Sequence, residues 1–91
     1  MDENQQQKII DTGRHAADLV KNPAFEEAFD VTLEKVFATF MATSPEENTE
    51  RDACWATCQA LRELRSTIDA FIANGEMELK NREYDRKQSS D

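Results

Sequence analysis

Two cysteines and a single histidine are the residues of this chain with the most obvious capacity for chemistry. Cys54 and Cys58 lie four residues apart, which is not the two-residue spacing of zinc ribbons or redox motifs. The surrounding sequence reads as a helix, and neighbouring turns of a helix give poor disulfide geometry. We therefore expect two thiols that pack as small core side chains. With no signal peptide and no long apolar run, the chain is expected to be intracellular in origin, with both thiols reduced.

The histidine, His15, has no cysteine or serine close to it in the sequence. A nucleophile–base pairing with one of the cysteines stays open at this stage. No glycine-rich turn is present to form an oxyanion hole, however, and a chain this short has little room for a substrate pocket. A histidine on the surface is the expectation.

Carboxylates recur along one predicted helix, at Glu26, Glu27, Asp30 and Glu34. A di-metal site of the bundle type also needs inward-facing Glu-x-x-His motifs, and the sequence has none. We interpret these carboxylates as a solvated helix face. The sequence thus predicts a protein that is not an enzyme, with no catalytic residue, no metal site, no cofactor and no small-molecule substrate.

Composition limits the class of protein further. The chain has 91 residues with 19 acidic and 11 basic side chains, for a net charge of −8, and only two glycines and two prolines. A single domain of a few long helices is expected. Nucleic-acid binders carry a basic stripe, and every basic cluster here has acidic residues between its members. No direct contact with nucleic acid or with a membrane is therefore predicted.

Helix signals divide the chain into three parts. Residues 1–22 form a polar segment and a short helix, whose Gly13 and Ala16 leave a thin face for close approach by another helix. Residues 23–75 form a helical hairpin in which one helix runs from Pro23 to about 42 and a second from Pro45 to about 74, ended by Gly75. Residues 76–91 form a charged C-terminal extension. The predicted fold class is all-α: an antiparallel helical hairpin with a short N-terminal helix and a charged C-terminal extension.

Large aromatic side chains exceed what one helix–helix contact can cover. The predicted protein-binding residues are Phe25, Phe29, Phe37, Phe40 and Trp55. Trp55 lies beside the predicted contact line of its helix, because Cys54 and Cys58 occupy that line. Either Trp55 packs on Phe40 or Met41 at the end of the hairpin, or it is an anchor for a partner, since tryptophan is enriched at binding hot spots.

The central part of the chain, residues 20–79, resembles a known group of proteins. The likeness rests on an N-P-x-F helix start, a second helix with Trp55 after an arginine, and an ending at Gly75, as seen in Asn22-Pro23-Ala24-Phe25, Ala28-Phe29, Phe37, Ala42-Thr43-Ser44-Pro45, Glu50-Arg51-Asp52, Leu61 and Ile68. In these features the chain resembles small, poorly characterised helical-hairpin proteins encoded in the structural and morphogenesis gene clusters of tailed bacteriophages.

This resemblance implies a structural or assembly component of a virion, associated with the head, portal or tail. The implied partners are a larger viral structural protein, identical copies of the chain, or both, and the implied location is the virion or the host cytoplasm. It carries over no catalytic residues. The alternative is a host-directed inhibitor whose acidic surface occupies a basic nucleic-acid-binding groove of a host protein.

Overall fold

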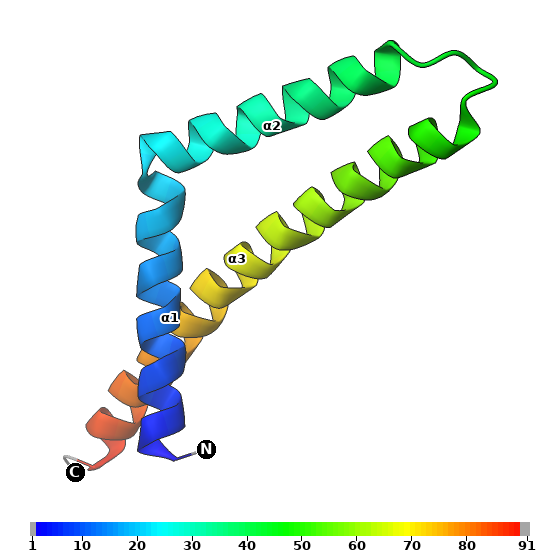
Figure 1. The fold of residues 1–91 in the computed structure, drawn as a ribbon. Coiled ribbons are helices and arrows are strands. Elements are labelled where there is room, and N and C mark those ends of the chain that lie inside the picture. The colour runs from blue at the N-terminus through cyan, green and yellow to red at the C-terminus, as the bar shows by residue number, and fades with distance from the viewer. Residues whose placement is uncertain (1, 90–91) are drawn as a thin grey trace. The chain divides into compact units, whose positions relative to one another are not determined.

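Three helices make up the described part of the chain, residues 2–89 of the computed structural model (Figure 1). They are α1 (Glu3–Lys21), α2 (Pro23–Met41) and α3 (Asn48–Ser89), and no strand occurs among the described residues. The predicted all-α class is confirmed. None of the described helices combines the length and the apolar content needed to cross a bilayer. Residues 90 and 91 of the expected C-terminal extension lie outside the described range.

Side-chain caps fix where α1 and α2 begin. The Asn22 side-chain oxygen accepts a hydrogen bond from the Ala24 backbone N–H at 2.8 Å, and Pro23 takes the first helical position, as the sequence predicts. Asp2 caps α1 in the same way, since its carboxylate accepts from the Gln5 N–H at 2.7 Å. Both helices therefore start at groups that satisfy backbone donors which no helical carbonyl can reach.

The start of α3 differs by three residues from the expectation at Pro45. The Glu47 N–H donates to the Ser44 carbonyl at 3.0 Å, which closes a turn instead of a first helical turn. Glu47 does reach back, because its carboxylate accepts from the Ser44 N–H at 3.3 Å and from the Ser44 hydroxyl at 3.1 Å. The Ser44 hydroxyl therefore bonds the Glu47 carboxylate and does not cap a helix at Pro45. The helix α3 begins at Asn48 instead.

The predicted helix stop at Gly75 is wrong. α3 continues from Asn48 to Ser89 without a break, and no glycine has the positive φ that a left-handed helix cap requires. Gly75 is buried within the helix, where its missing side chain serves close packing. The division of the chain at residues 22 and 75 stays a prediction.

Two compact units can be distinguished, and α3 contributes to both. Unit 1 comprises residues 1–20 and 67–91, and unit 2 comprises residues 21–66. In unit 1, α1 packs against the C-terminal half of α3 (Figure 1). Ile10 is the most buried large side chain, at 1% exposure, and the small residues Gly13 and Ala16 extend its face of α1.

The two helices of unit 1 cross at a pair of glycines. A Cβ atom placed on Gly13 would lie 2.8 Å from the Phe71 carbonyl oxygen and 2.9 Å from the Gly75 Cα. Real Cβ atoms essentially never approach other heavy atoms below 3.0 Å. The backbones are therefore close enough that only glycine fits at Gly13, which agrees with the thin helix face predicted from the sequence.

Unit 2 pairs α2 with the N-terminal half of α3 along one line of side chains. Glu26 contacts Arg65 at one end of this line, and Phe40 contacts Arg51 at the other, so the two segments run in opposite directions. We call this line the seam of unit 2. Its members are buried or half-buried and recur at three- and four-residue spacing: Glu26, Phe29, Leu33, Val36 and Phe40 from α2, with Arg51, Cys54, Cys58, Leu61 and Arg65 from α3.

The core of unit 2 is thin. Within residues 21–66, Cys54 is the only buried apolar residue, and α2 has no buried residue at all. Domains normally bury the apolar stripe of a helix against other elements, and very small domains rarely manage this alone. Unit 2 therefore leaves much of its apolar surface accessible to a partner.

Candidate protein-binding surface

A row of side chains flanks the seam on each helix of unit 2. Each residue of a row comes one position after a seam residue in the sequence. The α2 row consists of Glu27, Asp30, Glu34, Phe37 and Met41, and the α3 row of Asp52, Trp55, Gln59, Arg62 and Ser66. All ten residues are exposed.

Helix geometry places both rows on one side of unit 2. A step of one residue turns about 100° around a helix axis, in the same sense for every right-handed helix. Because α2 and this part of α3 run in opposite directions and face each other through the seam, equal turns carry both rows to the same side of the pair. The exposed apolar side chains Phe37, Met41 and Trp55 therefore share one face.

The register of the seam brings these three side chains to the same end of unit 2. The Arg51 guanidinium carbon lies 4.5 Å from the centroid of the Phe40 ring, which sets Phe40 level with Arg51. Phe37 lies one turn before Phe40, and Trp55 one turn after Arg51, so in antiparallel helices they remain level. We call Phe37, Met41 and Trp55 the aromatic patch, and their exposures are 63%, 64% and 65%.

The five predicted binding residues thus divide into two groups. Phe37 and Trp55 belong to the aromatic patch and are mostly exposed. Phe25, Phe29 and Phe40 are half-buried along or beside the seam, with the Phe25 and Phe29 ring centroids 6.2 Å apart. The assignment of all five to protein binding stays a prediction. Met41 was not among the five predicted binding residues. Its position four residues after Phe37, on the same side of the helix, is the sequence signal that could have identified it.

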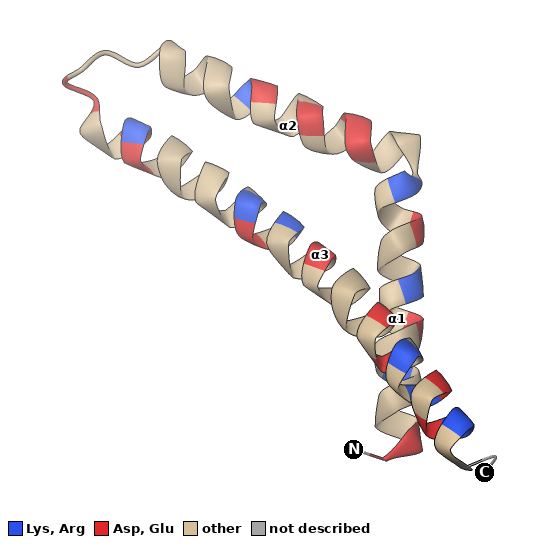
Figure 2. Ribbon diagram, turned by 180° about the vertical axis from the view of Figure 1, so that it is seen from behind, with Lys and Arg blue, Asp and Glu red and all other residues tan. Residues whose placement is uncertain are grey.

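Charged groups continue the face away from the aromatic patch. In the α2 row, Glu27, Asp30 and Glu34 precede Phe37, whereas the α3 row contains Arg62 at the corresponding distance from Trp55. Figure 2 shows acidic residues gathered along the N-terminal part of α2 and mixed charges along α3. Within the seam, the Arg65 guanidinium lies 2.9 Å from the Glu26 carboxylate and 5.7 Å from the centroid of the Phe29 ring.

A shallow hollow lies directly on the α3 row. Trp55, Gln59, Arg62 and Ser66 line it together with Glu63. It thus has an aromatic end at Trp55 and a polar end at which the side chains of Arg62 and Glu63 both lie.

The two cysteines and the histidine are not among the residues of the two rows. Cys54 is buried in the seam and Cys58 is half-buried, and both are free thiols. His15 is exposed on α1 in unit 1. Within residues 2–89, no group of three or more histidine, cysteine, aspartate or glutamate side chains is arranged to hold a metal ion.

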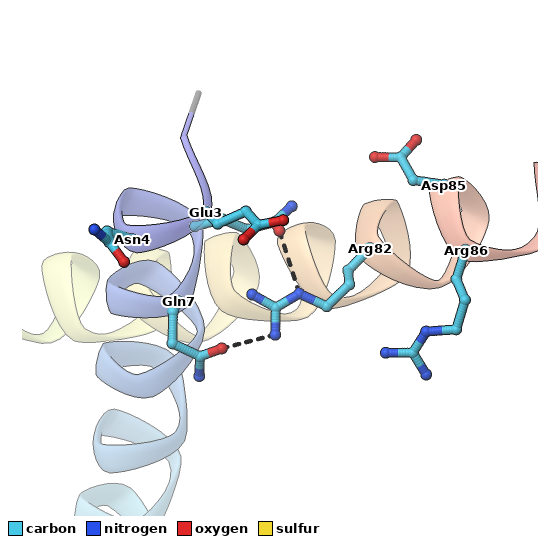
Figure 3. Close-up of a pocket in the computed structure, with 7 residues that line it drawn as sticks. Glu3, Asn4, Gln7, Arg82, Asp85 and Arg86 are labelled. Atoms are coloured by element: carbon cyan, nitrogen blue, oxygen red, sulfur yellow. Dashed lines mark hydrogen bonds between the residues drawn. The ribbon is translucent and has the colours of Figure 1, made fainter. Parts of the chain in front are cut away.

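A polar hollow belongs to unit 1 (Figure 3). Arg82 dominates it, because its Nη1 donates to the Gln7 side-chain oxygen at 2.7 Å and its Nε to the Gln6 side-chain oxygen at 3.2 Å. Gln6 in turn donates to Glu78 at 3.1 Å. The remaining lining residues are Glu3, Asn4, Asp85 and Arg86. These hydrogen bonds of Arg82 hold α1 against α3.

Comparisons with known proteins give no family for this chain, since no protein-family model, no curated protein and no solved structure matches it.

Proposed function

We propose that this chain is a non-enzymatic protein-binding accessory, in which a helical hairpin at residues 23–75 presents the aromatic patch to another protein. The observation that carries the proposal is the exposure of Phe37, Met41 and Trp55 on one face of a unit with a single buried apolar residue. Tryptophan and phenylalanine at the centre of a contact supply much of the binding free energy in protein interfaces.

Placement in a tailed-phage particle is the more specific part of the proposal. Its support is the resemblance of residues 20–79 to small proteins of phage structural gene clusters. In that setting the partners are a larger head, portal or tail protein, identical copies of the chain, or both, and the number of bound copies follows the particle's symmetry. The mechanism is burial of the aromatic patch, which remains incompletely covered within the chain itself.

Mass spectrometry of purified particles and assembly intermediates of the encoding phage tests this function. The variants to compare with the wild type are Trp55→Lys and Leu64→Lys, which add the same charge. Leu64 is 50% exposed and precedes the seam residue Arg65 by one position, so it lies on the opposite side of unit 2. We expect wild type and Leu64→Lys to be present in equal amounts and Trp55→Lys to be depleted at least tenfold.

Two results would contradict the proposal. Absence of the wild-type chain from particles and from all assembly intermediates rules out a virion or assembly role. Equal incorporation of Trp55→Lys removes the aromatic patch from the mechanism. Binding to a host nuclease or polymerase that disappears as salt is raised would instead identify the host-directed inhibitor, because contacts between exposed charges are screened by salt.

A further inference from the structure

We propose that the face carrying the two rows binds a second copy of this chain, with the α2 row of each copy lying antiparallel on the α3 row of the other. This inference rests on the proposed protein-binding function and names the partner and its register. The partner is derived from the order of side chains in the two rows and from the area that they expose.

The two rows are complementary when they are read in opposite directions. Phe37 of one copy then meets Trp55 of the other, at the centre of an apolar cluster. Asp30 meets Arg62, which places a carboxylate against a guanidinium. The full set of opposed positions is Glu27 with Ser66, Asp30 with Arg62, Glu34 with Gln59, Phe37 with Trp55, and Met41 with Asp52. No two like charges stand opposite each other.

A two-fold axis parallel to the helices generates this arrangement. The rotation places α2 of the second copy over α3 of the first at the same height, and α3 of the second over α2 of the first. Every contact therefore occurs twice, as in other isologous dimers. Both aromatic patches, six large side chains in all, meet at the same end of the resulting four-helix assembly.

The groups that form the central ion pair are available for it. Asp30 and Arg62 are exposed, and neither has an ion-pair partner among the described residues. Arg62 also lines the hollow on the α3 row, beside Gln59 and Trp55. A second copy would place its Asp30 opposite Arg62 and its Phe37 opposite Trp55, while Glu63, the carboxylate that also lines the hollow, lies outside the α3 row.

The exposed area is close to what a specific dimer requires. Large side chains of this kind bury roughly 150–250 Å² each when fully covered. With about two-thirds of each exposed, the aromatic patch offers roughly 400 Å² per copy, or roughly 800 Å² for two. Specific interfaces bury about 1,200 Å² or more in total, and the seven polar row residues of each copy can supply the remainder.

The other side of unit 2 is a poorer surface for a large contact. The positions that precede the seam by one residue are mostly small, and several hydroxyls among them already donate to their own helix. Thr32 donates to the Ala28 carbonyl at 2.7 Å, Thr39 to the Lys35 carbonyl at 2.9 Å and Thr57 to the Ala53 carbonyl at 2.9 Å. We therefore place the contact between copies on the side of the two rows.

A mixing experiment with two charge-reversal variants tests both the partner and the register. Asp30→Arg sets a second arginine against Arg62 of the other copy, and Arg62→Asp sets a second aspartate against Asp30 of the other copy. Sedimentation of the 91-residue chain at fixed salt measures the dimer dissociation constant for each variant and for their equimolar mixture. We expect the dimer dissociation constant of each variant alone to be about tenfold higher than that of the wild type, because the repulsive pair occurs twice in each symmetric dimer.

In the mixture, a dimer of one copy of each variant should form with an affinity within about threefold of the wild type. Both of its opposed pairs again join an acidic and a basic side chain. One opposed pair then joins the two introduced side chains, and the other joins the native Asp30 and Arg62. Mixing changes no single chain, and each variant chain still carries the same charge at positions 30 and 62. Recovery in the mixture therefore reports contacts between copies and not contacts within one chain. Circular dichroism at equal concentration checks that each variant retains its helix content. If Asp30→Arg does not fold, Asp30→Lys with Arg62→Glu applies the same logic with different side chains.

Each result bears on the proposal. Recovery in the mixture supports it. A wild-type chain that stays monomeric up to millimolar concentration overturns it, and so does a dimer that both variants leave unchanged. If Trp55→Lys abolishes the dimer but the mixture of Asp30→Arg and Arg62→Asp shows no recovery, the proposed register is overturned and the aromatic contact between copies stands. The proposed binding function fails separately, through equal incorporation of Trp55→Lys into particles.

Discussion

Replacement of Gly13 by alanine should destabilise the protein, although the same change normally stabilises a helix. In an exposed helix interior, alanine is favoured over glycine by about 1 kcal/mol. At Gly13 the new methyl group would lie 2.8 Å from the Phe71 carbonyl oxygen and 2.9 Å from the Gly75 Cα. Both neighbours are backbone atoms of α3, so relief requires the two helices to move apart.

The magnitude follows from two opposing contributions. Overpacking of a close contact costs about 1–3 kcal/mol, and here it also separates Ile10 from its covered position. Subtraction of the gain of about 1 kcal/mol in helix propensity leaves a net cost of about 0–2 kcal/mol. Because both close neighbours are backbone atoms and Ile10 also loses contacts, we expect Gly13→Ala to lower the free energy of unfolding by an amount in the upper half of that range, about 1–2 kcal/mol. Gly75→Ala should cost less, because its methyl group would meet the Gly13 Cα at 3.0 Å and the Ile9 carbonyl oxygen at 3.2 Å.

Urea unfolding followed by circular dichroism provides the measurement, at one fixed protein concentration. The exposed position Ala73 on α3 supplies the control, since Ala73→Gly changes propensity alone and should lose about 1 kcal/mol. Unfolding slopes should remain unchanged for all three variants, which would show that the same surface is exposed on unfolding. A Gly13→Ala variant more stable than the wild type would refute the close crossing of α1 and α3.

Three further outcomes are expected from single positions. Asn22→Ala should lower stability by about 1 kcal/mol in thermal unfolding, because the Ala24 N–H loses its acceptor, whereas a change below about 0.3 kcal/mol would mean that this cap contributes little. Ile10→Ala should cost about 2–5 kcal/mol, since Ile10 is 1% exposed, and a loss below about 1 kcal/mol would contradict its burial. Thiol labelling of the native chain should modify the half-buried Cys58 well before the buried Cys54, and equal rates would show that the seam opens freely.

Local signals in the sequence predicted the helix boundaries that local chemistry controls. Asn22 and Pro23 start α2 as expected, because a side-chain cap and a fixed proline φ need only neighbouring residues. Ser44 and Glu47 also interact, but the Ser44 hydroxyl bonds the carboxylate, and the helix begins later. The capping pattern therefore located the turn correctly and misplaced the helix start by three residues.

Gly75 shows where local signals fail. A glycine after an apolar run is typical of a helix end, yet here it lies inside α3 against Gly13. The two glycines are far apart in the sequence, and nothing near either one reveals the other. The same limit applies to Arg82, whose hydrogen bonds to Gln6 and Gln7 join residues from the two ends of the chain.

The candidate binding surface could be predicted in part. Three- and four-residue spacing placed Trp55 beside the contact line of its helix without deciding between packing on Phe40 or Met41 and a partner-facing position, and in the structure Trp55 is 65% exposed. The same reasoning assigned Phe37 to the apolar face of its helix without separating it from Phe40. Phe40 faces α3 and Phe37 does not. This difference follows from the contacts of Glu26 with Arg65 and of Phe40 with Arg51, which show which side of α2 faces α3.

The fluorescence of Trp55 tests the central claim most directly, because it is the only tryptophan of the chain and lies in the aromatic patch. Acrylamide quenching and the emission maximum should be measured on the 91-residue chain from nanomolar to millimolar concentration. If the patch is a protein-binding surface that a second copy covers, emission shifts to shorter wavelength and quenching falls as concentration rises, and Leu64→Lys behaves in the same way. A tryptophan that stays fully quenchable across the whole range would contradict the account.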